Sequence, residues 1–478
     1  MKRLPRSLRS LPPQGASSRL GRPCATDMDR RDFLCRAAAL STAGLAGALD
    51  LFPLAGHAAT TDYKALVCVF LFGGVDGNNV LVPTDTGGYG AYSAVRGASS
   101  GIQLTRAELL PIAPLAPNTY TSFGLHPALP ELKTLFDSGK LAFLANVGVL
   151  TQPTTKADYA AGRRPDNLFS HSDQQGEWQS AIASGDSRTG WGGRLADTTA
   201  SATGQGFPVI TSTAGVTLYV TGASSSPLAI PTTGSFGLSG FGTSAAAKAR
   251  LTALNSLLDI DRGNTLVAAA SDITKQAQSL AALVNPVLTS TSSTVMAAFG
   301  NQTTSIARQL LAVAKMIEAQ AVTGASRQIF FVSLGGFDTH NNEIATQQNL
   351  FSQLSPALKA FYDATATLGM ADRVTTFTLS DFGRTFQPAA GGGSDHAWGN
   401  HHIVMGGAVK GSSIYGQYPQ LILGGPSDAE KEGRWIPTTS VEQYGATLAR
   451  WFGADSTALA TVFPNLAAFA PADLGFLS

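Results

Sequence analysis

Three apolar runs rich in β-branched and aromatic residues decide the fold of this chain: Ala65–Phe72 (ALVCVFLF), Gln328–Leu334 (QIFFVSL) and Val374–Leu379 (VTTFTL). Short apolar runs of this kind are typical of buried strands in a parallel sheet. Segments with helical periodicity lie between the runs, and strands that alternate with helices predict a mainly parallel sheet with helices on both faces. We therefore expect an α/β protein built as a three-layer αβα sandwich.

Each of the three runs is followed closely by an acid: Asp76, Asp338 and Asp381. In a parallel α/β sheet the ligand crevice forms at the carboxyl ends of the strands, so these acids are expected at one edge. Six of the seven histidines follow residue 58, and most stand near the same strand ends: His126, His171, His340, His396, His401 and His402. Acids and histidines gathered at one edge predict a metal-assisted hydrolase site.

Composition narrows the class of protein. The chain has 478 residues, a net charge of +1, 44% hydrophobic and only 14% charged residues. Phosphate neutralisation needs a basic surface, so a nucleic-acid-binding protein is excluded. The length allows one large domain with an insertion or two domains. We expect a single domain over 59–478, with a Ser/Thr-rich and helical insertion over about 200–325.

The first 58 residues read as an export signal. Arg30 and Arg31 open a twin-arginine pattern (RRDFL), an alanine-rich apolar stretch follows, and small residues surround a cleavage point after Ala58. A membrane anchor is the rival interpretation, but the apolar stretch is short and interrupted by glycine. Met28 offers a later start, in which case residues 1–27 are not translated. We expect a periplasmic or secreted protein, handled by the twin-arginine export machinery, without a membrane span in the mature chain.

Two motifs directly after strands carry the most specific chemistry. Asp338 and His340 stand two residues apart in GGFDTH, a spacing that can aim both side chains at one metal; the alternative is an Asx turn with a solvated histidine. Asp381 and Arg384 stand in SDFGRT, where the acid is a metal-ligand candidate and the guanidinium can bind an anion with two hydrogen bonds.

Further metal-ligand candidates come from loops. The stretch GSDHAWGNHH contains His396, His401 and His402, of which one or two are expected as metal ligands and the others as outer donors or structural residues. Asp76 follows the first strand and, with Asn78, offers oxygen ligands to a hard cation; a plain turn is the alternative.

Ser170 is the candidate nucleophile. It precedes His171 at the expected start of a helix, where the helix dipole favours an alkoxide. Simple helix capping by Ser170 is the alternative, with Ser172 as the rival nucleophile. His126 more readily positions a turn or a ligand than takes part in catalysis.

Taken together, these motifs resemble the exported bacterial proteins of domain-of-unknown-function family 1501. The resemblance rests on eight stretches: Arg30–Leu34, Phe72–Asn79, Phe123–Pro127, Ser170–Gln174, Gly190–Arg194, Phe337–His340, Asp381–Thr385 and Asp395–His396. That family is similar to the alkaline phosphatase and sulfatase superfamily. The resemblance implies an alkaline-phosphatase-like αβα sandwich with one or two metals at the strand ends.

The resemblance also implies roles for individual residues. One metal would take Asp338, His340 and either His396 or His401. The other would take two acids and the hydroxyl nucleophile, for which the candidates are Asp76, Asp381 and Ser170. The chain departs from the superfamily in two respects: Phe382 follows Asp381 where a histidine ligand is expected, and the sulfatase motif Cys/Ser-x-Pro-x-Arg is absent.

Two functions follow as hypotheses. The first is a metal-dependent hydrolase of small anionic phosphate or sulfate esters, with Ser170 as nucleophile beside His171 and with Arg194 or Arg384 steadying the anion. The metal would be divalent, zinc first, with calcium, magnesium or manganese as alternatives. The second is a catalytically silent exported protein that keeps a structural metal and has a binding role. The number of histidines favours the first hypothesis, and Phe382 favours the second.

Overall fold

The computed structural model describes residues 62–97, 101–203, 207–238, 240–242 and 244–478. The predicted export signal, with Arg30 and Arg31, lies outside the described residues.

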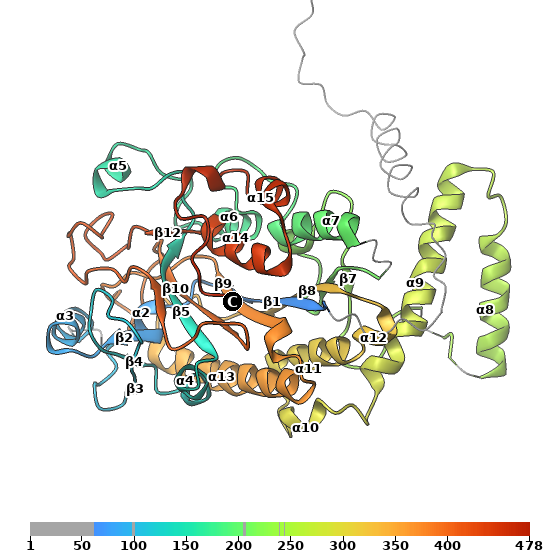
Figure 1. The fold of residues 1–478 in the computed structure, drawn as a ribbon, viewed down its shortest axis with the longest axis horizontal. Helices are drawn as coiled ribbons and strands as arrows, with labels where there is room; N and C mark the ends of the chain where they lie inside the picture. Colours follow the sequence, from blue (N-terminus) through green and yellow to red (C-terminus); the bar gives the residue numbers. More distant parts are fainter. Residues whose placement is uncertain (1–61, 98–100, 204–206, 239, 243) are drawn as a thin grey trace, which may run out of the picture.

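A nine-stranded sheet forms the centre of the molecule (Figure 1), in the order β11-β5-β10-β9-β1-β8-β6-β7, with β12 pairing to β5. The strands are β1 (Lys64–Leu71), β5 (Leu141–Gly148), β6 (Ile210–Ser212), β7 (Leu228–Ala229), β8 (Arg327–Leu334), β9 (Val374–Ser380), β10 (Asn400–Gly406), β11 (Ile414–Gly416) and β12 (Thr439–Ser440). Only β10 runs antiparallel to its neighbours, so the sheet is mainly parallel, as predicted.

The three predicted strands are the central three of this sheet. Strand β1 lies between β8 and β9, and its last residue Leu71 is in register with Leu334 on one side and Ser380 on the other. The three strands therefore end side by side. The loops that follow the three strands therefore lie at the same edge of the sheet.

Helices cover both faces of the sheet, because successive side chains of β1 point to opposite faces and both sets are apolar. Ala65, Val67 and Val69 belong to the core under one helical layer, whereas Leu66 and Phe70 belong to the core under the other. Figure 1 shows the two layers on opposite sides of the sheet. The first layer holds α4 (Pro130–Asp137), α11 (Ser305–Glu318) and α13 (Glu343–Thr367), and the second holds α6 (His171–Ser180), α7 (Trp191–Thr203), α14 (Val441–Phe452) and α15 (Ser456–Val462). The predicted three-layer sandwich is confirmed.

Shorter elements surround the sandwich. A three-stranded antiparallel sheet in the order β2-β4-β3 lies next to α3. The remaining elements are α2 (Gly77–Val80), β2 (Leu81–Pro83), α3 (Thr86–Arg96), β3 (Leu110–Ile112), β4 (Phe123–Leu125), α5 (Lys156–Ala160), η1 (Leu218–Val220), α10 (Met296–Phe299), α12 (Gln320–Thr323), η2 (Ala371–Arg373) and η3 (Leu466–Ala468).

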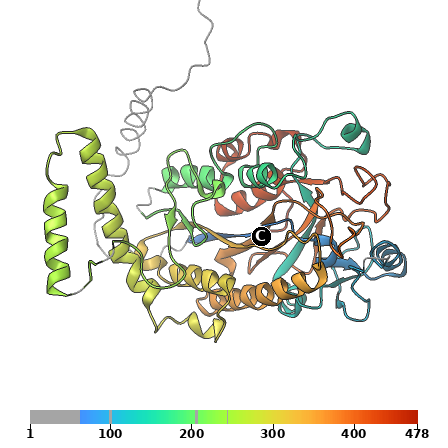
Figure 2. The same cartoon turned by 180° about the vertical axis from the view of Figure 1, so that it is seen from behind.

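A helical hairpin of α8 (Ala245–Leu258) and α9 (Thr265–Thr289) projects from one end of the sandwich in both views (Figures 1 and 2), and the last turns of α9 pack on α11. The hairpin lies within the predicted insertion over about 200–325. Strands β6 and β7 extend the main sheet beyond β8, and α11 packs on β8 within the first helical layer. Of the described part of that segment, the portion that projects is essentially the hairpin.

Across the described part of the chain, no helix combines the length and the hydropathy that a transmembrane span requires.

Candidate metal centre

A cluster of one carboxylate and three imidazoles lies at the edge where β1, β8 and β9 end. Asp338 Oδ1 lies 3.1 Å from His340 Nε2, 3.2 Å from His396 Nε2 and 3.5 Å from His171 Nε2. His340 Nε2 and His396 Nε2 are 2.9 Å apart. The candidate ligand atoms of His171, Asp338 and His396 all lie within 4.8 Å of one another. We call these four residues the metal centre.

The partners of the other ring nitrogens define the tautomers. In each of the three histidines Nδ1 lies within 3.0 Å of an oxygen atom that can only accept a hydrogen bond: Asp381 Oδ2 for His171, Asp395 Oδ1 for His340 and the Phe169 carbonyl for His396. With the proton on Nδ1, each Nε2 offers a lone pair to a cation. The three Nε2 atoms lie around one carboxylate oxygen, Asp338 Oδ1.

Nitrogen and oxygen donors of this kind could hold a divalent metal: His171, Asp338 and His396 are close enough to share one, and His340 lies beside them. Zn–N and Zn–O bonds of about 2.0–2.1 Å place tetrahedral ligand atoms about 3.3 Å apart. The separations from Asp338 Oδ1 are 3.1, 3.2 and 3.5 Å, and the two Nε2 atoms are 2.9 Å apart. His171 Nε2 is a buried atom without a hydrogen-bond partner among the described residues. A bound cation would offset the repulsion between the lone pairs of the facing Nε2 atoms, and it would also give His171 Nε2 a partner.

The metal centre is open to solvent on one side. The side chains of Asp338 and His340 are 46% and 39% exposed, and those of His171 and His396 are 31% and 23% exposed. Structural zinc sites are closed, whereas catalytic sites keep a position free for water or substrate. The exposure therefore favours a catalytic site.

Burial and charge act together on two members of the metal centre. Burial tends to raise the pKa of Asp338, but the charge and the hydrogen bond of Arg384 act against it, and the pKa is lowered overall. Burial lowers the pKa of His396, against the hydrogen bond to the Phe169 carbonyl that raises it. Both shifts favour the metal-binding form, a carboxylate and a neutral imidazole.

The segment that enters α6 brings His171 and the Phe169 carbonyl to the metal centre. Asn167 and Phe169 adopt φ values of 53° and 75°, a region that residues other than glycine rarely occupy. The Phe169 ring lies 4.5 Å from the guanidinium of Arg434, which holds the segment from outside. Strained backbone of this kind tends to occur at functional sites.

Asp381 lies behind the metal centre, which corrects its prediction as a metal ligand. It is fully buried; Oδ1 accepts from the Gly73 N–H at 3.1 Å, and Oδ2 accepts from His171 Nδ1 at 2.7 Å and Gln175 Nε2 at 2.8 Å. Asp381 thus orients His171. Phe382, which stands where a histidine ligand was expected, packs its ring 4.8 Å from His171 and 4.6 Å from His396.

Two other predicted ligands are not at the metal centre. Asp76 is fully buried and pairs with both terminal nitrogens of Arg96, while its Oδ1 also accepts from Asn78. His401 Nδ1 accepts the Asn146 N–H at 3.0 Å, so Nε2 carries the proton. Burial lowers the pKa of His401 to about 3. Neither residue presents a free lone pair to the cluster.

The predicted nucleophile, Ser170, stands directly before α6. Ser170 lies between Phe169 and His171, and its Oγ donates to Asp173 Oδ2 at 2.5 Å, with Ser172 Oγ 3.2 Å away. It begins α6 without capping it through its side chain, so the capping alternative does not describe it.

The two predicted anion-binding arginines serve other purposes. Arg384 is buried and donates to Asp338 Oδ1, the Gly73 carbonyl and Ser394, so it orients a member of the metal centre. Arg194 donates to the backbone carbonyls of Thr189, of Ser180 at the end of α6 and of Val462. These bonds tie α7 to its neighbours, and among the described residues none of the contacts of Arg194 is with the metal centre.

Residues that the sequence alone did not single out complete the surroundings. Asp395 and Gln175 hold His340 and Asp381, and a buried acid, Glu343, lies behind the loop that carries Ser394. Asp395 had a signal, since it directly precedes His396. Gln175 lies four residues after His171, one turn along a predicted helix, and Glu343 had no comparable signal.

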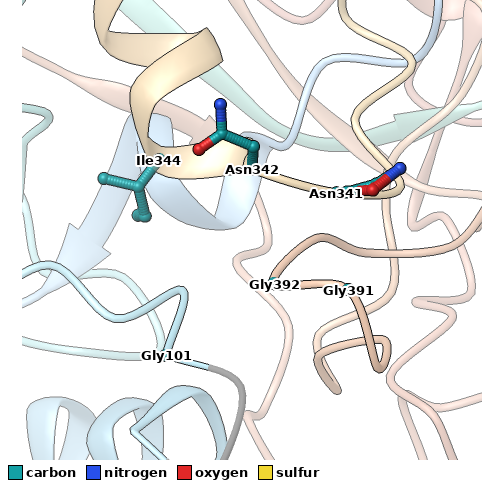
Figure 3. Close-up of a pocket in the computed structure, with 6 residues that line it drawn as sticks. All are labelled: Gly101, Asn341, Asn342, Ile344, Gly391 and Gly392. Atoms are coloured by element: carbon teal, nitrogen blue, oxygen red, sulfur yellow. The ribbon is translucent and has the colours of Figure 1, made fainter.

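A shallow cavity of about 330 Å³ adjoins the segments that carry the metal centre. It is lined by Gly101, Asn341, Asn342, Ile344, Gly391 and Gly392. In Figure 3, the segment of Asn341 and Asn342 lies opposite the Gly391–Gly392 loop, and the Asn342 side chain points away from that loop. Asn341 directly follows His340, and the glycine loop leads to Asp395 and His396, so the cavity and the metal centre share their framework.

Solved structures overlap this chain only distantly. Ps i-CgsB in complex with k-i-k-neocarrahexaose is 10% identical, with 83% of this chain and 73% of that chain covered and a TM-score of 0.33. The lipoteichoic acid synthase LtaP from Listeria monocytogenes is 9% identical, with 81% and 79% covered and a TM-score of 0.32. The PsFucS1 sulfatase from Pseudoalteromonas sp. is 9% identical, with 88% and 72% covered and a TM-score of 0.31. At this distance none of them bears on the activity of this chain.

None of the curated proteins matches the chain. One family model does: "Protein of unknown function (DUF1501)" matches residues 63–460, which include the whole metal centre, the central sheet and the loops described above. The family predicted from the sequence motifs is confirmed, and the chain belongs to the DUF1501 family.

Proposed function

We propose that this chain is an exported, metal-dependent hydrolase of phosphate or sulfate esters. The observation that carries the proposal is the convergence of three histidine Nε2 atoms on Asp338 Oδ1 at a solvent-exposed edge of the sheet. His171, Asp338, His340 and His396 would hold the ion, zinc first and calcium, magnesium or manganese as alternatives. A divalent ion at such a site supplies a Lewis acid for the ester oxygen and favours an ionised oxygen nucleophile at neutral pH.

The chain itself would orient the reacting groups. Asp381 fixes the ring of His171, and Arg384 fixes the carboxylate of Asp338. Ser170 is the proposed nucleophile, because the residues on both sides of it contact the metal centre. Asp173 Oδ2, 2.5 Å from Ser170 Oγ, is placed to accept the hydroxyl proton. The hydrogen bond from Ser170 lowers the pKa of Asp173, so this acceptor is ionised at neutral pH.

The adjoining cavity gives the alcohol part of an ester a place to lie. Its lining of two asparagines, three glycines and an isoleucine carries no charge, and it adjoins the segments that supply His340 and His396. A small anionic ester could therefore place its charged group at the metal centre and its neutral group in the cavity.

The alternative, a silent binding protein with a structural metal, predicts a closed site. The exposure of all four members of the metal centre opposes it. Phe382, which leaves no second histidine beside Asp381, favours one metal over two but is neutral on catalysis.

The test combines metal analysis with a substrate screen. Purified protein should contain close to one equivalent of zinc or another divalent metal, and should hydrolyse p-nitrophenyl phosphate or p-nitrophenyl sulfate. Dialysis against a chelator should abolish turnover, and zinc should restore it. Stoichiometric metal without turnover of any phosphate or sulfate ester would support the silent alternative, and absence of metal would overturn both.

Export is a separate part of the proposal and rests on Arg30 and Arg31 in the sequence. Replacement of both arginines by lysine should keep the protein in the cytoplasm in a cell fractionation experiment, because twin-arginine signals require the pair. Unchanged periplasmic protein would contradict it.

A further inference from the structure

A chain of buried polar side chains leads from the metal centre into the protein. Arg384 Nη1 donates to Asp338 Oδ1 at 3.1 Å, and Arg384 Nε donates to Ser394 Oγ at 3.0 Å. Ser394 Oγ in turn donates to Glu343 Oε2, which also accepts from Thr339 Oγ1 at 3.2 Å. Each link is a direct side-chain hydrogen bond, so Glu343 contacts Asp338 through only two intermediates.

The inner end of this chain is anchored by a buried ion pair. Glu343 Oε1 lies 3.7 Å from Arg96 Nη1, and Arg96 pairs with Asp76 and donates to the Thr385 carbonyl. The side chains of Asp76, Arg96, Glu343 and Arg384 are all 0% exposed. Asp76 and Glu343 share Arg96, and burial together with the charge of Asp76 raises the pKa of Glu343 to about 8, so that Glu343 is largely protonated at neutral pH.

We propose that Ser394 and Glu343 are positioning residues of the metal centre: they hold the guanidinium of Arg384, and through it the carboxylate of Asp338, in the place from which Asp338 binds the metal. This inference rests on the proposed function. Asp338 is almost half exposed and stands on a loop, and the hydrogen bond from the buried Arg384 restrains its carboxylate on the side of the protein interior. Outer partners that orient metal ligands typically contribute 10–100-fold to metal affinity.

The physical reason lies in the directions that the network imposes. A guanidinium is planar, so fixing Nε on Ser394 also fixes the direction in which Nη1 donates. Without the Ser394 hydroxyl, Arg384 loses a charge-assisted partner, and Glu343 loses a hydrogen-bond donor in a buried setting. The Ser394 carbonyl still accepts from Nε and Nη2 and the Gly73 carbonyl from Nη1, so the guanidinium stays in place but is held less firmly. The Asp338 carboxylate that it bonds is then held less firmly as well.

The experiment compares zinc affinity in metal-stripped, full-length protein by competition with a chromophoric chelator. Ser394→Ala and Glu343→Ala should each weaken zinc binding by about 10-fold, because the hydroxyl link is lost while the backbone hydrogen bonds of Arg384 remain. The matched control is Ser355→Ala. Ser355 is a fully buried serine of α13 that donates to Glu131 and accepts from the Leu132 N–H, with no contact to the metal centre. Its loss should leave zinc affinity unchanged. Equal affinities in the Ser394→Ala variant and the unmodified protein would overturn the inference.

A second measurement needs no metal and separates this inference from the proposed function. Thermal unfolding of the metal-free Ser394→Ala, Asp338→Ala and double variants forms a double-mutant cycle. The two substitutions should lower the melting temperature by less together than the sum of their separate effects, because both interrupt the same chain through Arg384. Additive effects would contradict the positioning. Failure of the unmodified protein to bind zinc would contradict the proposed function, and the cycle would still decide whether Ser394 and Asp338 are coupled.

Discussion

The proton on each imidazole decides which nitrogen can bind a metal. His171, His340 and His396 place Nδ1 against an acceptor oxygen, which leaves Nε2 with its lone pair. His126 and His401 do the reverse, because Nδ1 of each accepts a backbone N–H and Nε2 then carries the proton. The same residue type thus serves two purposes within one protein, and the partner of Nδ1 distinguishes them.

At the residue scale we predict that His396→Ala abolishes zinc binding, because it removes one of the converging Nε2 atoms. Asp395→Asn should have a smaller effect, about 10-fold, because the amide oxygen can still accept from His340 Nδ1 but makes the ring less basic. Both can be measured by zinc titration of metal-stripped protein. Asp363→Asn, a change at an exposed residue paired with Lys359, is the control. Full zinc content in His396→Ala would contradict the metal centre.

Ser170→Ala should reduce ester turnover by about 10³-fold or more without loss of zinc, because a nucleophile contributes to the transition state and not to metal affinity. Ser172→Ala is the matched control, since its hydroxyl lies 3.2 Å from that of Ser170 and should leave turnover largely intact. If Ser172→Ala is the inactive variant, the rival nucleophile is correct. If Ser170→Ala loses zinc together with activity, the serine is a ligand.

At this scale the sequence anticipated part of the site. Asp338, His340 and His396 were expected to meet because their segments follow strands of one sheet, and the structure brings them together. His401 and Asp76 were expected there too. Their actual partners, the Asn146 N–H and Arg96, are set by tertiary contacts that no local motif encodes. His171 was expected beside a nucleophile and stands instead among the ligand candidates.

At the scale of elements, a buried acid in α14, Glu442, makes the stability of the fold depend on pH. Glu442 lies in the first turn of α14, where the helix dipole favours a carboxylate. Its side chain is nonetheless buried, and Oε2 has no hydrogen-bond partner among the described residues. Burial raises the pKa of Glu442 to about 7 from an ordinary 4.5. Desolvation therefore outweighs the dipole.

This shift predicts a direction for stability. Between pH 4.5 and about 7 the unfolded chain releases the Glu442 proton while the folded chain retains it, so the free energy of unfolding falls as pH rises through this range. The loss amounts to at most about 3 kcal/mol by pH 8. Glu442→Gln should reduce the decline in melting temperature between pH 5 and pH 8. An unchanged pH profile would show that Glu442 is ionised in the fold.

The positions of the three central strands could be predicted from the sequence, but the conformation of the segment before α6 could not. The three apolar runs were recognisable because strands buried on both faces lack alternation. The segment that leads into α6 has positive φ angles at Asn167 and Phe169, which could not be predicted from these two residue types. Strands β6 and β7 were not predicted, because they are only three and two residues long and fall within a Ser/Thr-rich stretch.

At the scale of the whole molecule, the metal centre joins segments from α6, the loop after β8 and the loop before β10. A ligand that binds only the folded state stabilises it by about 2.7 kcal/mol at 100 times its Kd. We therefore predict that zinc raises the melting temperature of metal-free protein by a few degrees and that a chelator reverses the shift. Differential scanning fluorimetry measures this directly. The His396→Ala variant should show no shift, and a shift of equal size there would place the zinc elsewhere.

The central position of β1 has a consequence during synthesis. Lys64 at the start of β1 pairs with Arg327 of β8, 263 residues further along the chain, and β9 follows later still. At about 5–20 residues per second, a ribosome takes roughly 10–50 s to deliver the first partner of β1. For that time a strand with seven buried residues out of eight has neither neighbour. The nascent chain therefore needs protection from aggregation, and chaperone supply or slower growth should raise its soluble yield.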